Sequence, residues 1–261
     1  MAVIKAGALY RQVAAEMRAS IASGEWATGT QIPREDQLAE LYDVSRPTVR
    51  QAVAELRAEG LLDVRQGRGS FVRDRDARNA VDMEQYVTRT GTRYATGTDQ
   101  WARSQEPTTV RVRLDPHSAA LLDLAEGEAA FQVECPLIHE ASGTLAIHRM
   151  IMPMERITGT PLAKAAVDSV AKVYATLAAA NGDLEWRETV TARMPNPDEL
   201  TSLQLPEGVP LLISHRVTLA QADQRPLILE TTTLGASSAQ FAYAFQPTIK
   251  ARTTSRAKPA N

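Results

Sequence analysis

The chain has 261 residues, of which 44% are hydrophobic and 23% charged, and its formal net charge is −2 at pH 7. This length and this share of apolar side chains suffice for a buried core and favour two domains. The sequence contains no apolar run of ~18 residues and does not begin like a signal peptide, so we expect a cytoplasmic protein with no membrane partner.

One cysteine and four histidines limit the chemistry of the chain. Cys135 stands alone and cannot form an internal disulfide, and the histidines lack the spacings that are typical of metal ligands. The sequence shows no pairing of a nucleophile with a base and no phosphate-binding glycine motif. It therefore predicts no metal, no cofactor and no enzymatic activity.

Charge is unevenly distributed along the chain. Residues 45–75 contain seven arginines and four acidic residues, a net charge of +3, so the remainder carries −5. A basic segment of this kind indicates a surface for nucleic acid, even in a chain whose total charge is negative.

Three short helices are predicted before residue 61. Apolar residues three and four apart define the inner face of each helix. These residues are Tyr10, Val13, Met17 and Ile21 in the first helix, Leu38, Leu41 and Tyr42 in the second, and Val49, Val53 and Leu56 in the third. Ser45 is a favourable N-cap for the third helix, and Pro47 fits its first turn. Arg46 and Arg50 then lie one turn apart on the outer side.

Two short strands are predicted after the third helix, one starting at Leu61 and one at Ser70, with a tight turn at 67–69 between them. Three helices followed by such a two-stranded wing form a winged helix-turn-helix, whose recognition helix enters the major groove of DNA. The planar guanidinium of arginine can bind guanine or phosphate through two hydrogen bonds. We therefore predict that Arg46 and Arg50 face DNA.

The chain contains the run G-x-W-x-x-G-x-x-I-P-x-E-x-x-L-A-x-x-Y-x-V-S-R-x-T-V-R-x-A-x-x-x-L-x-x-E-G-L-L, followed by G-R-G-S-F-V. In this spacing, residues 8–73 resemble the DNA-binding domain of the GntR family. The resemblance implies DNA contacts at the start of the third helix, at the wing tip and in the loop before the second helix. The implied contact residues are Arg34, Ser45, Arg46, Thr48, Arg50, Gln66, Gly67, Arg68 and Gly69. Arg34 stands where the family usually has serine.

Residues 74–108 are polar and rich in threonine, which is typical of a connector. At most one short helix, containing Met83, Tyr86 and Val87, is expected there. We divide the chain into a DNA-binding domain (1–75), a linker with the entry to the second domain (76–108), a second domain (109–248) and a disordered tail (249–261).

Beyond residue 108, alternating strands and short helices predict an α+β domain built on an antiparallel sheet. Val110, Val112 and Leu114 are expected to point inward from the first strand of this domain. Two hairpins are predicted, one turning at 142–143 and the other at 222–224.

Two segments of this domain have the same order of features: LDPHSAALLDLAEGEAAFQVE and MPNPDELTSLQLPEGVPLLISH. Each begins with a proline-led helix and continues through Glu-Gly into a strand. The duplication and the stretch VTARMPNPDEL…LPEGVPLL resemble the UTRA effector-sensing domain of the HutC branch of the GntR family, over about residues 80–247. The resemblance implies a chorismate-lyase-like fold that holds a small organic effector between two hairpins.

In sugar-phosphate-responsive relatives, arginines on the first hairpin strand bind the phosphate, but that strand here reads Phe-Gln-Val-Glu-Cys-Pro at 131–136. This departure argues against a phosphosugar, because no fixed bidentate cation is present to bind it. The effector-binding residues implied by the resemblance are His148, Arg149, Arg216 and Glu230. Ordinary charged residues on a sheet surface are the alternative interpretation of Arg149, Arg216 and Glu230.

Together these features predict a homodimeric, ligand-responsive repressor that binds palindromic double-stranded operator DNA and is released by a small organic effector. Two alternatives stay open. One is a dimeric repressor whose C-terminal domain only dimerises, without an effector. The other, more remote, is a lyase-type enzyme acting on a small acid, which fold analogy alone suggests.

Overall fold

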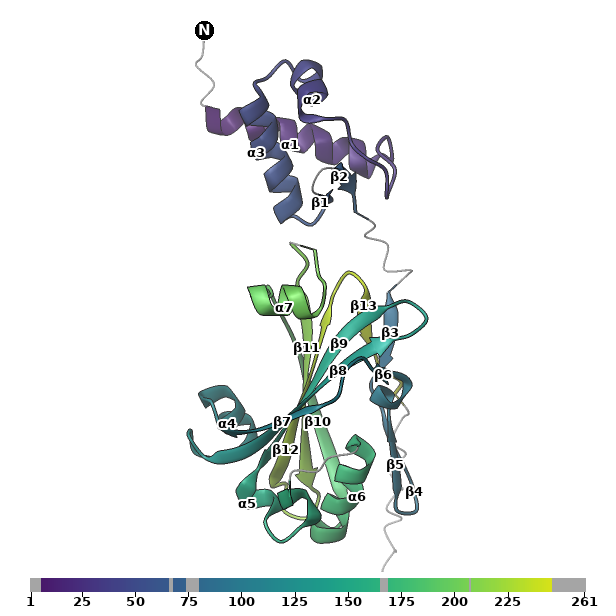
Figure 1. The fold of residues 1–261 in the computed structure, drawn as a ribbon, viewed down its shortest axis with the longest axis vertical. Coiled ribbons are helices and arrows are strands. Elements are labelled where there is room, and N and C mark those ends of the chain that lie inside the picture. The colour runs from purple at the N-terminus through teal and green to yellow at the C-terminus, as the bar shows by residue number, and fades with distance from the viewer. Residues whose placement is uncertain (1–5, 66–67, 74–79, 165–168, 207, 246–261) are drawn as a thin grey trace, which may run out of the picture.

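The structure, a computed structural model, describes residues 6–65, 68–73, 80–164, 169–206 and 208–245. It contains an N-terminal helical unit and a larger domain built on an antiparallel sheet (Figure 1). This confirms the predicted α+β class. Among the described residues, no helix combines the length and the apolar character needed to cross a membrane.

The N-terminal unit consists of three helices and a two-stranded antiparallel sheet. Its elements are α1 (Ala6–Ala22), α2 (Glu35–Leu41), α3 (Arg46–Ala58), β1 (Leu62–Arg65) and β2 (Gly69–Val72). One core joins the predicted inner faces of the helices, and it includes Met17, Leu38, Val49 and Leu56. The amphipathic pattern therefore locates the helices and most of their buried residues correctly.

Leu41 departs from this pattern. It was expected on the buried face of α2, but it is 64% exposed. The helix ends at Leu41, and the chain then turns through Asp43, whose φ is +50°. Only one residue of this seven-residue helix, Leu38, is fully buried. This helix of two turns packs through Leu38 and the half-buried Ala39, and its last residue extends past the core.

A seven-stranded sheet forms the larger domain, in the order β10-β11-β12-β9-β8, with β6 and β7 both paired to the outer side of β8. Its strands are β6 (Ala102–Arg103), β7 (Thr108–Arg113), β8 (Ala129–His139), β9 (Thr144–Pro153), β10 (Leu184–Arg193), β11 (Leu211–Ala220) and β12 (Pro226–Gly235). Both predicted hairpins are present, as β8–β9 and β11–β12.

The sheet is built from two similar halves. The first half runs β7, α4 (Pro116–Leu122), β8 and β9, and the second runs β10, α7 (Pro197–Ser202), β11 and β12. The halves meet where β9 pairs with β12, at the centre of the sheet. Both helices begin with a polar cap followed by proline, Asp115 before α4 and Asn196 before α7. The repeat seen in the sequence is therefore a repeat in the structure.

One face of the sheet is covered by α6 (Val170–Asn181) and by residues that precede β6. These residues form β3 (Val81–Glu84), β4 (Val87–Thr90), β5 (Arg93–Thr96) and the 3-10 helix η2 (Gly97–Gln100). The prediction of a short helix around Met83 is wrong, because Met83 lies in β3. This segment is a strand because it pairs in parallel with β13 (Ala239–Ala242), which comes from the other end of the domain.

The remaining elements are α5 (Met154–Ile157) and the 3-10 helix η3 (Pro161–Lys164), which follow β9. Val110 of β7 was expected to point inward, but it is 49% exposed. It lies on an edge strand, and in β7 only Val112 is half-buried while the other residues are exposed.

The two parts of the chain meet at a pair of glycines. A Cβ atom placed on Gly208 would lie 2.6 Å from the carbonyl oxygen of Arg57, near the end of α3. A Cβ atom on Gly60 would lie 3.2 Å from the carbonyl oxygen of Gly208. Both glycines have positive φ, +70° at Gly60 and +77° at Gly208. Backbone from the two parts can approach this closely because neither residue carries a side chain.

Candidate functional site

The first turn of α3 is exposed to solvent and is capped by Ser45. Ser45 has extended backbone angles, and its Oγ accepts a hydrogen bond from the backbone N–H of Thr48 at 3.4 Å. Its Oγ also lies 2.8 Å from the hydroxyl oxygen of Thr48. Arg46 and Pro47 are exposed at the first turn. The cap fixes the backbone of this turn, so the side chain of Arg46 projects from a rigid base.

Arg50, one turn further along α3, is paired within the unit. Its Nη2 lies 2.9 Å from Oε2 of Glu35, the first residue of α2, while the Arg50 side chain stays 71% exposed. The hydrogen bond with Glu35 raises the pKa of Arg50. An exposed pair of this kind contributes little to stability, so a phosphate can replace the carboxylate at little cost. Sequence reasoning gave no indication of Glu35, because fifteen residues separate the partners.

Three further expected DNA-contact residues, Arg34, Arg68 and Gly69, are described in the same N-terminal unit. Arg34 is exposed, and its backbone N–H donates to the side chain of Gln37 at 2.9 Å. At the wing, the amide of Gln31 donates to the carbonyl of Arg68 at 2.9 Å, and Gly69 has a φ of +108°. Gln66 and Gly67, also expected at the wing tip, lie outside the described residues.

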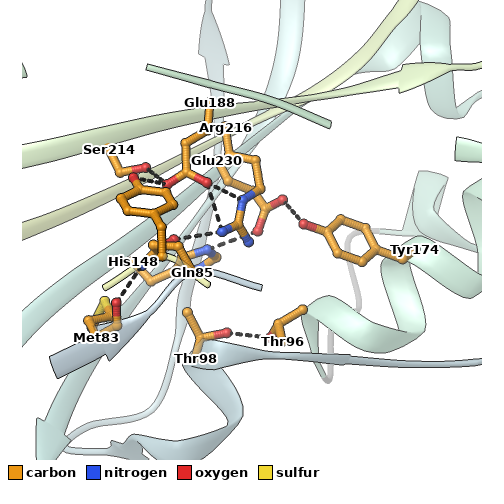
Figure 2. Close-up of polar contacts among 11 residues, drawn as sticks. Met83, Gln85, Thr96, Thr98, His148, Tyr174, Glu188, Ser214, Arg216 and Glu230 are labelled. Atoms are coloured by element: carbon orange, nitrogen blue, oxygen red, sulfur yellow. Dashed lines mark hydrogen bonds and ion pairs between the residues drawn. The ribbon is translucent and has the colours of Figure 1, made fainter. Parts of the chain in front are cut away.

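A second polar centre is buried in the sheet domain (Figure 2). Glu230 of β12 is 3% exposed and binds His148 of β9, whose Nε2 is 3.1 Å from Oε1 of Glu230. The hydroxyl of Tyr174, from α6, donates to the other oxygen of Glu230. Both carboxylate oxygens are thus engaged, one on each side. The helix α6 is fastened to the sheet through this contact.

Arg216 of β11 lies beside Glu230 and is 7% exposed. Its Nη2 lies 2.9 Å from Oε2 of Glu188 on β10 and donates to the side-chain oxygen of Gln85 at 2.6 Å. Glu188 also accepts hydrogen bonds from Ser214 and from Tyr243. The cluster therefore joins the three strands β10, β11 and β12 to the residue that follows β3.

The charges in this cluster determine its protonation. Burial alone would raise the pKa of Glu230, but the hydrogen bond from His148 and the charge of Arg216 outweigh it and hold that pKa below its usual value. Burial and the neighbouring Glu230 charge raise the pKa of Tyr174 well above its usual value, so this hydroxyl stays a donor. The cluster thus contains two carboxylates, Glu188 and Glu230, and one guanidinium, Arg216.

A cavity of about 240 Å³ opens beside the cluster. His148 belongs to both, because its ring lines the cavity while its Nε2 reaches Glu230. The polar lining consists of Thr98, Asp99, Arg103, Cys135, His148 and Ser169, and the apolar lining of Trp101, Pro107, Val133, Leu137, Met150 and Val170. This volume suits a small molecule with few heavy atoms.

Arg149 is separated from this site. Neighbouring residues of a strand point to opposite faces, so Arg149 projects from the far side of β9, where its Nη2 lies 2.6 Å from Oε2 of Glu134. It lines a second cavity of about 410 Å³, together with Arg193, Glu199 and His215. The structure thus brings His148, Arg216 and Glu230 together and excludes Arg149 from their site.

In this second cavity, His215 packs against His117 with ring centroids 5.0 Å apart. Burial, followed by the charges of His117 and Arg193, lowers the pKa of His215. Arg193 and Glu199 form a two-bond pair, with Nη2 2.5 Å from Oε1 and Nη1 2.7 Å from Oε2. Among the described residues, no group of three or more potential ligands could hold a metal ion.

Sequence reasoning missed several residues of the buried cluster. Tyr174 lies among the apolar residues of α6, and Glu188 and Gln85 carry no sequence pattern of their own. The approach of Gln85 to Arg216 joins residues 131 positions apart. A local pattern cannot indicate such a contact.

Comparison with known proteins gives two matches to protein families. Residues 9–72 match the family described as bacterial regulatory proteins, gntR family. Residues 108–238 match the UTRA domain. The two matches cover the helical unit with its wing and most of the sheet domain.

Individual relatives match mainly in the first of these regions. The chain is 45% identical over 64 residues to the uncharacterized HTH-type transcriptional regulator YisV of Bacillus subtilis (strain 168), a match that covers 24% of this chain and 13% of that protein. It is 41% identical over 73 residues to the probable fructoselysine utilization operon transcriptional repressor of Escherichia coli (strain K12), covering 28% and 30%. The chain thus spans less than a third of these curated relatives.

A crystal structure described as a GntR-family transcriptional regulator resembles this chain along nearly its whole length. It covers 92% of this chain and 98% of its own, with a TM-score of 0.65 and 21% sequence identity. At this identity the likeness concerns the fold alone.

Proposed function

Because the chain belongs to the GntR family of bacterial regulatory proteins and carries a UTRA domain, we propose that it is a homodimeric transcriptional repressor released from its operator by a small organic effector. Two recognition helices related by a two-fold axis would read the half-sites of a pseudo-palindromic operator. Membership of a family of regulators argues against the remote alternative of a lyase-type enzyme.

The observation that carries the DNA-binding part is the exposed first turn of α3. Its backbone is fixed by Ser45, and Arg46 projects from it beside the exposed Arg50. On DNA, a phosphate can take the place that the Glu35 carboxylate occupies against Arg50. The nine residues expected from the sequence remain the proposed contact set, with Arg46 and Arg50 as its centre.

The cavity beside His148 supports the effector part of the proposal. It adjoins a buried cluster of two carboxylates and one guanidinium, and its own lining contains one cation, Arg103, and one anion, Asp99. Arg216 already faces Glu188, and Arg149 lies on the other face of the sheet. This composition favours a small uncharged or zwitterionic polar molecule over a phosphorylated sugar. Of the residues predicted to bind an effector, His148 lines this cavity and is the proposed contact, whereas Arg216 and Glu230 lie in the buried cluster behind it and position His148.

Release from DNA requires only modest coupling between the two parts. A coupling free energy of about 1 to 3 kcal/mol changes operator affinity roughly 5- to 150-fold. The same factor must apply in the other direction, so operator DNA must weaken effector binding equally.

Genomic-fragment selection with the purified protein identifies the operator, and gel-shift titration then tests the recognition helix. Arg46→Ala and Arg50→Ala should each lose about 1 to 3 kcal/mol of operator affinity. Arg93→Ala is the control, because Arg93 is an exposed arginine of β5 in the other domain. Operator binding at wild-type affinity by both α3 variants would contradict the assignment.

Metabolite screening by thermal shift tests the effector part. A ligand of this cavity should raise the melting temperature of the wild type and not that of His148→Ala, whose cavity wall is altered. If no small polar molecule stabilises the wild type, the alternative of a repressor without an effector is favoured.

A further inference from the structure

The strand β10 forms one edge of the large sheet. It runs for ten residues and pairs with β11 along its whole length in a continuous register. In the described part of the chain, no strand pairs with its outer side. Residues 189–193 are exposed on both faces of the strand. The exposed side chains include Val190, at 45%, and Met194 just beyond the strand, at 56%.

Free edge strands are normally protected against pairing with another chain. Charged side chains, lysine above all, proline, a β-bulge or a very short strand provide this protection. The sequence of β10, LEWRETVTAR, contains no proline or lysine and pairs without a bulge, but it carries four charged residues, Glu185, Arg187, Glu188 and Arg193. The opposite edge differs, because there β6 and β7 divide the outer side of β8 between two shorter strands. The edge of β10 is thus long, regular and open to hydrogen bonding.

We propose that β10 pairs in antiparallel fashion with β10 of a second copy of this chain, about a two-fold axis at Thr189. The proposal rests on the dimeric regulator proposed above and assigns the surface that makes the dimer. The axis stands perpendicular to the sheet, so both copies present the same face on the same side. In such a pair, one residue lies on the axis, opposite the same residue of the partner strand, and we name each register after that residue. Directly opposite side chains then point to the same face of the sheet in both copies, because side chains alternate along a strand.

Among the registers that pair seven or more residues of β10, charge selects one. Centred on Thr189, Glu185 lies opposite the partner's Arg193, and the symmetric pair repeats this contact. A register centred on Glu188 would place the two Glu188 carboxylates opposite each other. A register centred on Val190 would place Arg187 opposite the partner's Arg193. Like charges directly opposite are destabilising, whereas opposite charges stabilise the pairing.

The side chains needed for the two ion pairs are accessible. Glu185 is exposed, and the Arg193 side chain is 49% exposed although it already binds Glu199. A guanidinium has five N–H donors, so it can bind a second carboxylate. In the same register the exposed Met194 lies opposite the partner's Leu184. The two sheets then join into one continuous sheet, and neither β10 remains an edge.

A cysteine at the two-fold axis tests both the surface and the register. Directly opposite residues of antiparallel strands have Cα atoms about 4.5 to 5.5 Å apart, within the range that a disulfide spans. Full-length Thr189→Cys should therefore form a covalent dimer on mild oxidation. Thr191→Cys is the matched control, because the two 191 positions would lie about 13 Å apart. The wild type, which contains Cys135, reports any background crosslinking. Crosslinking of Thr191→Cys in preference to Thr189→Cys would overturn the register.

Sedimentation equilibrium of Thr189→Lys tests the surface without oxidation. Two lysines would meet at the axis, so the dimer dissociation constant should rise by about tenfold or more. Thermal unfolding should stay close to wild type, because Thr189 is exposed. A wild-type dissociation constant in Thr189→Lys overturns the proposal and leaves the dimeric regulator standing. A wild-type chain that stays monomeric at all concentrations and on operator DNA overturns both.

The C-terminal residues 246–261 are the other candidate for this edge, and a chain ending at residue 245 separates the two occupants. If a second copy occupies β10, this shorter chain dimerises like the full chain. If the C-terminal residues occupy it, their removal strengthens self-association at least several-fold, and the proposal fails. The effect of Arg46→Ala in gel shifts tests DNA binding separately. It does not depend on which segment pairs with β10.

Discussion

Glu230 shows how single residues determine the character of the buried site. Its carboxylate accepts hydrogen bonds from His148 and Tyr174 on opposite sides, and Arg216 supplies a nearby positive charge. A buried carboxylate with such partners is stable, but the removal of any one partner leaves a polar group without compensation. The cavity proposed for the effector therefore has a rigid polar wall next to His148.

Glu230→Gln should destabilise the sheet domain. The amide has nearly the same shape but loses the charge that Arg216 and His148 compensate, so we expect the free energy of unfolding to fall by about 1 to 3 kcal/mol. Tyr174→Phe removes one hydrogen bond and should cost about 1 kcal/mol. Urea titration followed by tryptophan fluorescence measures both, because Trp186 packs against Tyr174. Equal stability of Glu230→Gln and the wild type would contradict this account.

His215 should make stability depend on pH in the neutral range. Its pKa in the folded state lies below the ordinary value near 6.5, because of burial and the charges of His117 and Arg193. The unfolded chain then binds more protons, so stability falls as the pH drops below about 6.5. Urea midpoints at pH 7.5 and 5.5 should differ less in His215→Gln than in the wild type. His117→Gln should also reduce the difference, since it removes one of the charges that lower the pKa.

At the scale of elements, the cap of α3 links folding to DNA binding. Ser45→Ala removes the acceptor of the Thr48 N–H and should cost about 1 kcal/mol of stability in the N-terminal unit. Ser45→Asp restores the cap, but it adds a negative charge at the surface proposed to meet phosphate. We expect Ala to lose stability and operator affinity, and Asp to regain only stability. Recovery of operator affinity by Asp would argue against contact with DNA at this turn.

The elements also show which structural information is local. Both hairpins were predictable, because Ser142 and Gly143 or residues 222–224 mark turns between alternating strands. The strand β3 was not, since its partner β13 lies about 150 residues later in the chain and no nearby pattern reveals it. The exposure of Leu41 depends on where α2 ends, which periodicity does not determine.

In the candidate site, too, some features could be predicted from local sequence and others depend on the tertiary structure. The start of α3 could be assigned from sequence, because Ser45, Pro47 and the arginines lie within six residues. The separation of Arg149 from His148 also follows from the alternation of side chains along β9, once the strand is recognised. The partners of Arg216 come from β10 and from the residue after β3, and only the tertiary structure brings them together.

At the scale of the whole molecule, the contact of Gly208 with the end of α3 should orient the two parts of the chain. An alanine at Gly208 would place its Cβ 2.6 Å from the carbonyl oxygen of Arg57, which forces the parts to separate. Gly159→Ala is the matched control, because Gly159 has nearly the same φ and open space around it. Small-angle X-ray scattering should give a larger radius of gyration for Gly208→Ala only. Equal radii for the two variants would mean that this contact does not orient the parts.

The large sheet has a cavity on each of its two faces. Consecutive residues of β9 line different cavities: His148 lines the one next to Glu230, and Arg149 lines the one that contains His215. Insertion of one residue into β9 would exchange them, turning a guanidinium toward the buried carboxylate and an imidazole away from it. A change of length within one strand would thus alter the lining of both cavities at once, which no point substitution can do.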